Sequence, residues 1–262
     1  MYPWRPGLLF MKLPNKILEK KLLSSDYDLV IGVDEVGMGC LAGPVVVCAV
    51  AFDKKFFDKV HPDLHGIRDS KLLSPSQREE FAKELMKEKD LSFKITYCHP
   101  KIIDKINIYQ AARLAMRKAV KKLIGKSAIH PPENSRARVT TERERGSGEP
   151  SRANPGSRVG GMADLPKAIV LIDGKTKING LNFDQQAIVK GDQKVFTIAC
   201  ASILAKVFRD KMMIKYAKKF PNYGFEKHKG YGTKDHLEKL IKHGPCAIHR
   251  CSFSPVAKLV KI

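Results

Sequence analysis

An apolar run that ends in two adjacent carboxylates constrains this chain more than any other feature. Leu29 to Val33 is apolar throughout, and Asp34 and Glu35 follow it directly. A glycine-rich turn then leads into a second apolar run, Val45 to Phe52. Short apolar runs bounded by turn residues are typical of buried strands. The two acids therefore lie at the edge of a hydrophobic sheet, where unpaired negative charge is costly. We expect a cationic partner there.

Two further acids repeat this arrangement. The apolar run from Ala168 to Ile172 ends in Asp173, and Asp192 lies in a glycine turn before a helical pattern. Four converging acids cannot all stay ionised without a counterion, and an all-oxygen ligand set suits Mg²⁺ or Mn²⁺. Two such ions can activate water for phosphodiester hydrolysis. The pattern favours a nuclease, although single acids at strand ends also serve as turn formers or helix caps.

The two adjacent acids can share one site only under a stereochemical condition. Neighbouring residues of a strand face opposite ways, so Asp34 and Glu35 share a site only if the chain twists between them. Gly37 and Gly39 supply conformational freedom at this point.

The charge balance points in the same direction. The 262 residues include 48 Lys and Arg against 27 Asp and Glu, a formal net charge of +21. This excess favours a polyanionic partner, although a generally basic surface would give the same balance. The charge-free run from Val36 to Phe52 contains Gly and Pro and is shorter than the ~20 residues of a membrane span. We therefore expect no membrane attachment, and the first ten residues lack a signal-peptide pattern.

Strand and helix patterns alternate along the chain, which predicts an α/β domain over residues 26–262. We interpret residues 1–25 as a basic, partly amphipathic extension. The segment from about 126 to 166 is rich in Ser, Arg, Glu, Pro and Gly. It buries too little apolar surface to offset its ordering entropy, so we predict a disordered insertion within the domain.

Capping residues predict where helices begin. Ser74 and Gln77 have the spacing of a capping box, with a helix to about Lys89, and Asn107 has the same spacing to Gln110. The second helix has a basic face that is either solvated or in contact with nucleic acid. A long helix is expected from Ala199 to Lys219. It carries Asp210, which is either a fifth acid of the site or the partner of Lys206 or Arg209 in an ion pair.

Cysteine and histidine positions give weaker signals. The six cysteines contain no Cys-x-x-Cys pair, which favours a reducing, cytoplasmic setting. Cys246 and Cys251 lie near His249, but their spacing is poor for zinc. We expect no ligand-like pairing among the four tail histidines, which are His228, His236, His243 and His249.

Eight motifs then occur in one order over residues 30–256, with only the insertion excepted. They are Val-Asp-Glu-Val-Gly-x-Gly-x-Leu-Ala-Gly-Pro, Asp-Ser-Lys-x-Leu-Ser, Asn-Ile-x-Gln-Ala, Ile-Asp-Gly, Lys-Gly-Asp, Ala-Ser-Ile-Leu-Ala-Lys-Val-x-Arg-Asp, Tyr-Gly-Phe-x-x-His-Lys-Gly-Tyr-Gly-Thr and His-Arg-x-Ser-Phe. Together they resemble the ribonuclease HII family. The resemblance implies an RNase H-like fold, with a mixed sheet flanked by helices and a C-terminal helical part. It also implies cleavage of the RNA strand of RNA–DNA hybrids, and cleavage 5′ to single ribonucleotides in duplex DNA.

The resemblance also implies roles for individual residues. The family's catalytic, metal-binding acids correspond to Asp34, Glu35, Asp173 and Asp192. The turn whose main chain reads the ribose 2′-hydroxyl corresponds to Gly37, Met38 and Gly39, and the tyrosine that stacks on the sugar to Tyr231. Residues that approach the backbone phosphates correspond to Ser70, Lys71, Asn107, Ser202 and Lys206.

Two departures from the family pattern weaken the expected substrate contacts. Met38 replaces the central arginine of the turn, and Cys251 stands where a basic residue is expected. A catalytically weak nucleic-acid-binding protein is therefore one alternative. Another is the sister ribonuclease HIII, which prefers longer hybrids and has an N-terminal substrate-binding domain, whereas about 25 residues precede the first strand here. The C-terminus shows no clamp-binding peptide, and we expect a monomer.

Overall fold

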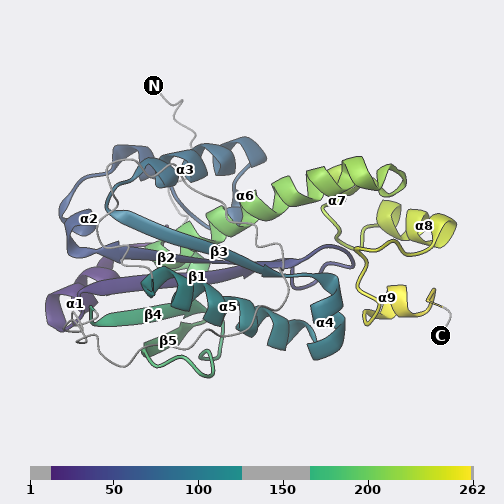
Figure 1. The fold of residues 1–262 in the computed structure, drawn as a ribbon. Coiled ribbons are helices and arrows are strands. Elements are labelled where there is room, and N and C mark those ends of the chain that lie inside the picture. Colours follow the sequence, from purple (N-terminus) through teal and green to yellow (C-terminus); the bar gives the residue numbers. More distant parts are fainter. Residues whose placement is uncertain (1–12, 126–165, 261–262) are drawn as a thin grey trace, which may run out of the picture.

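The two apolar runs around Asp34 form the centre of a five-stranded sheet (Figure 1). The computed structural model describes residues 13–125 and 166–260. β1 (Leu29–Val36) pairs antiparallel with β2 (Val45–Asp53) and parallel with β4 (Ala168–Asp173). β3 (Leu91–Cys98) and β5 (Asp184–Ile188) complete the order β3-β2-β1-β4-β5. The expected mixed sheet is confirmed, but β1 continues through Asp34 and Glu35 to Val36 because β2 pairs with it over this length.

Helices cover both faces of the sheet. α6 (Phe196–Lys219) packs on β1 and β2 from one face and contacts α3 (Pro75–Lys87). α5 (Ile108–Ile124) packs on β2 and β3 from the other face. The predicted capping box at Ser74 is present, and Asn107 accepts from the Gln110 N–H as the predicted cap of α5. The helix starts follow from local sequence because these side chains pair with N–H groups that the first turn leaves unpaired.

Glycine at position 32 lets α6 reach the sheet. A Cβ on Gly32 would lie 2.4 Å from the carbonyl carbon and oxygen of Thr197, in the first turn of α6. No side chain fits in that space, so β1 and the start of α6 touch through their backbones. This contact fixes the segment before α6, which contains Asp192, next to the end of β1.

The C-terminal residues form a separate helical part beyond one end of the sheet, as Figure 1 shows in yellow. It contains α7 (Phe225–His228), α8 (Lys234–His243) and α9 (Ser254–Ala257). The remaining helices are α1 (Ile17–Ser25), α2 (Lys54–Asp58) and α4 (Pro100–Ile106). The predicted insertion at 126–166 falls almost entirely outside the described residues. Within the described ranges, no helix combines the length and apolar character needed to cross a membrane.

Candidate active site

Two strand ends bring the first acids together. β1 and β4 run parallel with Val33 opposite Ile172, so Asp34 and Asp173 follow at neighbouring positions. Side chains alternate along a strand, and Val30 and Leu171 pack in the core cluster that contains the α6 residues. Asp34 lies four residues after Val30, and Asp173 lies two residues after Leu171. Both acids are therefore on the face of the sheet that α6 covers. Glu35 follows Asp34 directly, so by the same alternation its side chain leaves β1 on the opposite face.

The third acid comes from the turn before α6. Asp192 lies in the 3₁₀ helix η3 (Gly191–Gln193) and is buried. The Gly191 N–H donates to Asp173 Oδ1 at 2.7 Å, which fastens this turn to the end of β4. Lys71 Nζ lies 3.4 Å from Asp192 Oδ2, with its side chain 78% exposed. An exposed lysine thus borders the acids on the solvent side.

Asp34, Glu35 and Asp192 hold protons more tightly than usual, because burial and the charges of neighbouring acids raise their pKa values. Burial raises the pKa of Asp34 well above its ordinary value, and the charges of Glu35 and Asp173 raise it further. Burial and the charge of Asp173 raise the pKa of Glu35 to about 7. Burial and Asp173 also raise the pKa of Asp192. A cation among these groups would remove the repulsion.

The acidic centre has a donor set that fits a hard divalent cation. Its ligands are carboxylate oxygens, and Glu35 Oε2 is buried without a hydrogen-bond partner. A buried carboxylate oxygen with no donor is costly unless a cation binds it. Within the described ranges, no three His, Cys, Asp or Glu side chains already converge as a complete metal site. A shared metal site would therefore require these side chains to turn toward a common point.

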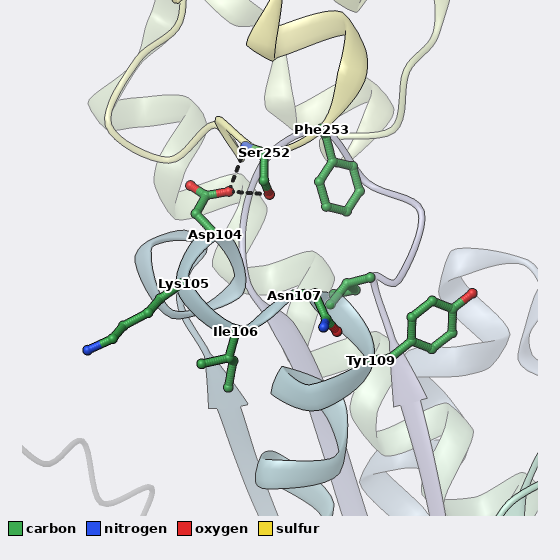
Figure 2. Close-up of a pocket in the computed structure, with 8 residues that line it drawn as sticks. Asp104, Lys105, Ile106, Asn107, Tyr109, Ser252 and Phe253 are labelled. Carbon is green, nitrogen blue, oxygen red and sulfur yellow. Dashed lines mark hydrogen bonds between the residues drawn. The ribbon is translucent and has the colours of Figure 1, made fainter. Parts of the chain in front are cut away.

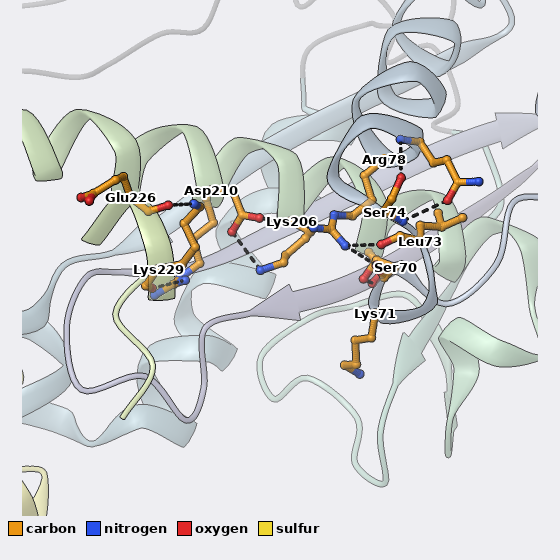
Figure 3. A network of polar contacts seen from close by, with 12 residues as sticks. Ser70, Lys71, Leu73, Ser74, Arg78, Lys206, Asp210, Glu226 and Lys229 are labelled. Carbon is orange, nitrogen blue, oxygen red and sulfur yellow. Dashed lines mark hydrogen bonds and ion pairs between the residues drawn. The ribbon is translucent and has the colours of Figure 1, made fainter. Parts of the chain in front are cut away.

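Two predicted phosphate contacts lie behind the acids instead of on the surface. Ser70 and Ser202 are buried, and their hydroxyl oxygens are 2.9 Å apart. Ser202 also hydrogen-bonds Asp34. Arg78, in α3, donates to the Ser70 and Leu73 carbonyls, which fastens the Ser70 segment to the start of α3 (Figure 3).

Lys206 and Tyr231 lie together on the other side of this network. Lys206 Nζ is 2.9 Å from Asp210 Oδ1, so the ion-pair alternative for Asp210 is confirmed (Figure 3). The same Nζ lies 5.6 Å from the centre of the Tyr231 ring, and Tyr231 is 40% exposed. An exposed aromatic ring with a cation beside it is suited to a sugar-phosphate strand.

Asn107 lines a pocket whose lining residues include none of the four acids. The pocket has a volume of about 530 Å³ and lies between the α4–α5 junction and the tail segment with Ser252 and Phe253 (Figure 2). Asp104 accepts from the backbone N–H groups of Cys251 and Ser252, and from the Ser252 hydroxyl. The backbone of Cys251 is therefore fixed, while its side chain is exposed.

Three of the four tail histidines contact one another in the folded chain. His236 Nε2 lies 3.0 Å from His249 Nε2, and the ring of His228 stacks on that of His236 with centroids 4.3 Å apart. Sequence spacing could not show this, because α7, α8 and the last loop fold together around Tyr223 and Phe225. Sequence reasoning also gave Arg250 no role, although it is fully buried beside the turn at residues 37–39.

Comparisons with known proteins identify the family to which the chain is similar. A family model for ribonuclease HII matches residues 31–132 and 164–256. The ribonuclease HII of Caldicellulosiruptor bescii is 42% identical over 236 residues, which cover 90% of this chain and 91% of that protein.

Solved structures share the fold. The ribonuclease H2 of Pyrococcus horikoshii has a TM-score of 0.61 and 23% identity, covering 88% of this chain and 96% of that one. Bst-RNase HIII, solved in complex with Mn²⁺, has a TM-score of 0.59 and 16% identity, covering 91% and 71%. The RNase H-like fold with its C-terminal helical part is thus confirmed. The chain belongs to the ribonuclease HII family of endonucleases.

Proposed function

We propose that this chain is a divalent-metal-dependent endoribonuclease that cuts 5′ to single ribonucleotides in duplex DNA and within the RNA strand of RNA–DNA hybrids. The observation that supports this proposal most is the group of acids at the ends of β1 and β4, which repel one another and include a buried carboxylate oxygen with no hydrogen-bond partner among the described residues. Family membership supports the hydrolysis of RNA in hybrids.

The residues proposed to hold the ions are Asp34, Glu35, Asp173 and Asp192. When bound there, Mg²⁺ or Mn²⁺ supplies activation of a water molecule for in-line attack and stabilisation of the leaving oxygen, which gives 5′-phosphate and 3′-hydroxyl ends. The Mn²⁺ complex of Bst-RNase HIII supports this ion class. The Gly191 N–H orients Asp173, and Ser202 orients Asp34 from within the protein.

Substrate contacts are proposed on both sides of the acids. The turn of Gly37, Met38 and Gly39 and the ring of Tyr231 would contact the ribose at the junction. Lys71, Lys206 and Asn107 would approach the backbone phosphates; Lys71 and Asn107 are exposed, whereas Lys206 is half-buried. The burial of Ser70 and Ser202 favours a supporting role behind Asp34 over direct contact with the substrate.

The proposal includes the setting and the partners. The substrates are RNA–DNA hybrids and ribonucleotide-containing DNA, acted on in the cytoplasm by a monomer. The free thiols of all six cysteines fit a reducing compartment. A sliding-clamp partner is not part of the proposal.

A panel of four labelled duplexes tests the function. They carry one ribonucleotide, a run of four ribonucleotides, a full RNA strand, or DNA alone. With Mg²⁺ we expect nicking of the first three and none of the fourth, and no nicking in EDTA. Asp34→Asn should abolish nicking, whereas Asp184→Asn should not, because Asp184 is exposed on β5.

Other outcomes favour other functions. Nicking that requires the longer ribonucleotide tracts would favour ribonuclease HIII-type specificity. Binding of every duplex without nicking would favour a nucleic-acid-binding module, which the Met38 and Cys251 departures make worth testing. Either result would refute the proposal.

A further inference from the structure

Arg250 lies at a junction of three chain segments that meet beside the candidate ribose site. Cys40 pairs with Tyr231 and Ala42 with His249 in isolated antiparallel bridges, so residues 40–42, 231 and 249 lie side by side. The Arg250 N–H donates to the Leu41 carbonyl at 2.8 Å. The tail thus runs directly behind the turn that follows β1.

The Arg250 side chain is fully buried and donates into the connection between β1 and β2. Its Nη2 lies 2.6 Å from the Gly37 carbonyl oxygen, its Nη1 2.9 Å from that of Met38, and its Nε 3.0 Å from that of Gly43. Three donors of one planar group reach three carbonyls, a geometry that lysine cannot reproduce. The charge strengthens each bond. Arg250 therefore fixes the orientation of two successive peptide planes.

The direction of these carbonyl groups also sets the direction of the N–H groups that follow them. In a trans peptide the N–H points opposite to the preceding C=O. Because the Gly37 and Met38 carbonyls point inward to Arg250, the N–H groups of Met38 and Gly39 point outward. Neither donates to a carbonyl within the described part of the chain. The space beside Gly39 is open, since a Cβ built there would meet no atom within 4 Å.

Gly37 is the residue that lets the turn adopt this conformation. Its φ is +98°, and a Cβ there would lie 2.4 Å from Arg209 Nε. The turn is therefore shaped by Gly37, held by Arg250 and open to solvent at Gly39.

We propose that Arg250 is a positioning residue for ribose recognition, which aims the Met38 and Gly39 N–H groups at the 2′-hydroxyl of the substrate. This inference rests on the proposed function, which puts the ribonucleotide at this turn. It also accounts for the tolerance of methionine at position 38, because the two donors belong to the backbone.

Binding measurements test the inference directly. We would measure the fluorescence anisotropy of two labelled DNA duplexes, identical except for one ribonucleotide, with Ca²⁺ replacing Mg²⁺ to prevent cleavage. Two hydrogen bonds to the 2′-hydroxyl correspond to a preference of roughly tenfold or more for the ribonucleotide duplex. We expect wild type to show this preference and Arg250→Met to lose most of it.

Two further variants separate positioning from stability. Leu240→Ala opens a cavity in the cluster of Leu41, Leu240 and Val256, so it destabilises the same part of the protein without touching the turn carbonyls. It should keep the preference. If Arg250→Met does not fold, Arg250→Lys keeps the charge without the planar fork and should show a reduced preference.

Each outcome decides between the two proposals. A folded Arg250→Lys or Arg250→Met protein with the full wild-type preference would overturn the role of Arg250 and leave the proposed function intact. An equal loss in Leu240→Ala would also overturn it, because general destabilisation would then explain the effect. A wild-type protein without preference would refute the ribose site itself, and the inference with it.

Discussion

Two buried histidines of the tail, His236 and His249, predict an acid-sensitive C-terminal part, because both are held neutral. His236 Nδ1 faces the Tyr231 carbonyl at 2.8 Å and must donate, so its Nε2 accepts. His249 Nδ1 accepts from the Cys246 N–H at 2.9 Å, so its Nε2 donates to His236. Hydrogen bonds therefore run in one direction from Cys246 to Tyr231. A second proton on either ring would replace an acceptor by a donor, so that two donors would face each other.

Burial sets the size of the effect. It lowers the pKa of His236 to about 4, and burial together with His236 lowers that of His249 to about 4. In the unfolded chain the pKa of a histidine is about 6.5. The unfolded state therefore binds more protons between these values, so stability from each ring is complete above about pH 6.5 and is lost as the pH falls toward 4. From pH 7 to pH 5 the loss is about 2 kcal/mol for each histidine.

The acids of the candidate site have the opposite effect on the pH dependence of stability. Burial and Asp173 raise the pKa of Glu35 to about 7, so its protonation favours the folded state as the pH falls. The pH dependence of the free energy of unfolding of wild type alone therefore cannot isolate the histidines, and variants must be compared.

Urea unfolding at pH 7 and pH 5 of wild type, His236→Leu and the exposed control His65→Gln provides this comparison. We expect His236→Leu to lose less stability on acidification than wild type, by about 2 kcal/mol. His65→Gln should follow wild type. Equal pH dependence in His236→Leu and wild type would refute the assignment of neutral, directed histidines.

Three other predictions concern contacts in and around the site. Gly32→Ala should destabilise the protein by about 1–3 kcal/mol or more in urea unfolding, because its Cβ would meet the Thr197 backbone at 2.4 Å; a change within experimental error would contradict the close packing of α6 on β1. Asp210→Asn frees Lys206, so duplex affinity at low salt should rise a few-fold and depend more steeply on salt in anisotropy titrations; unchanged affinity and slope would show that Lys206 does not contact the substrate. Tyr231→Ala should weaken binding of the ribonucleotide duplex by about 1–3 kcal/mol while Tyr231→Phe retains it, and equal affinities for both variants would exclude a stacking role.

Local signals in the sequence were sufficient for much of the fold. The strand around Val30, the capping box at Ser74 and the cap at Asn107 each depend on neighbouring residues, so their patterns predict them directly. The end of β1 was harder to predict, because its last residues are held by pairing with β2 and not by their own apolar character.

Long-range contacts account for what the sequence could not show. The burial of Ser70 against Ser202 depends on the docking of its segment on α6, and hydroxyl groups carry no signal of that. The histidine pair needs α8 and the last loop to meet. In the sequence Arg250 looks like a surface cation. Only the folded structure shows that it donates hydrogen bonds to three backbone carbonyls.

The central claim is that acids at the ends of β1 and β4 gather divalent ions that carry out hydrolysis. Single-turnover nicking of a duplex with one ribonucleotide, by wild type and Asp173→Asn across a Mg²⁺ titration, tests it most directly. We predict that Asp173→Asn slows nicking by about a thousandfold or more, since metal catalysis contributes several kcal/mol, while duplex affinity stays close to that of wild type. Nicking at the wild-type rate by Asp173→Asn, or by wild type without a divalent ion, would contradict it.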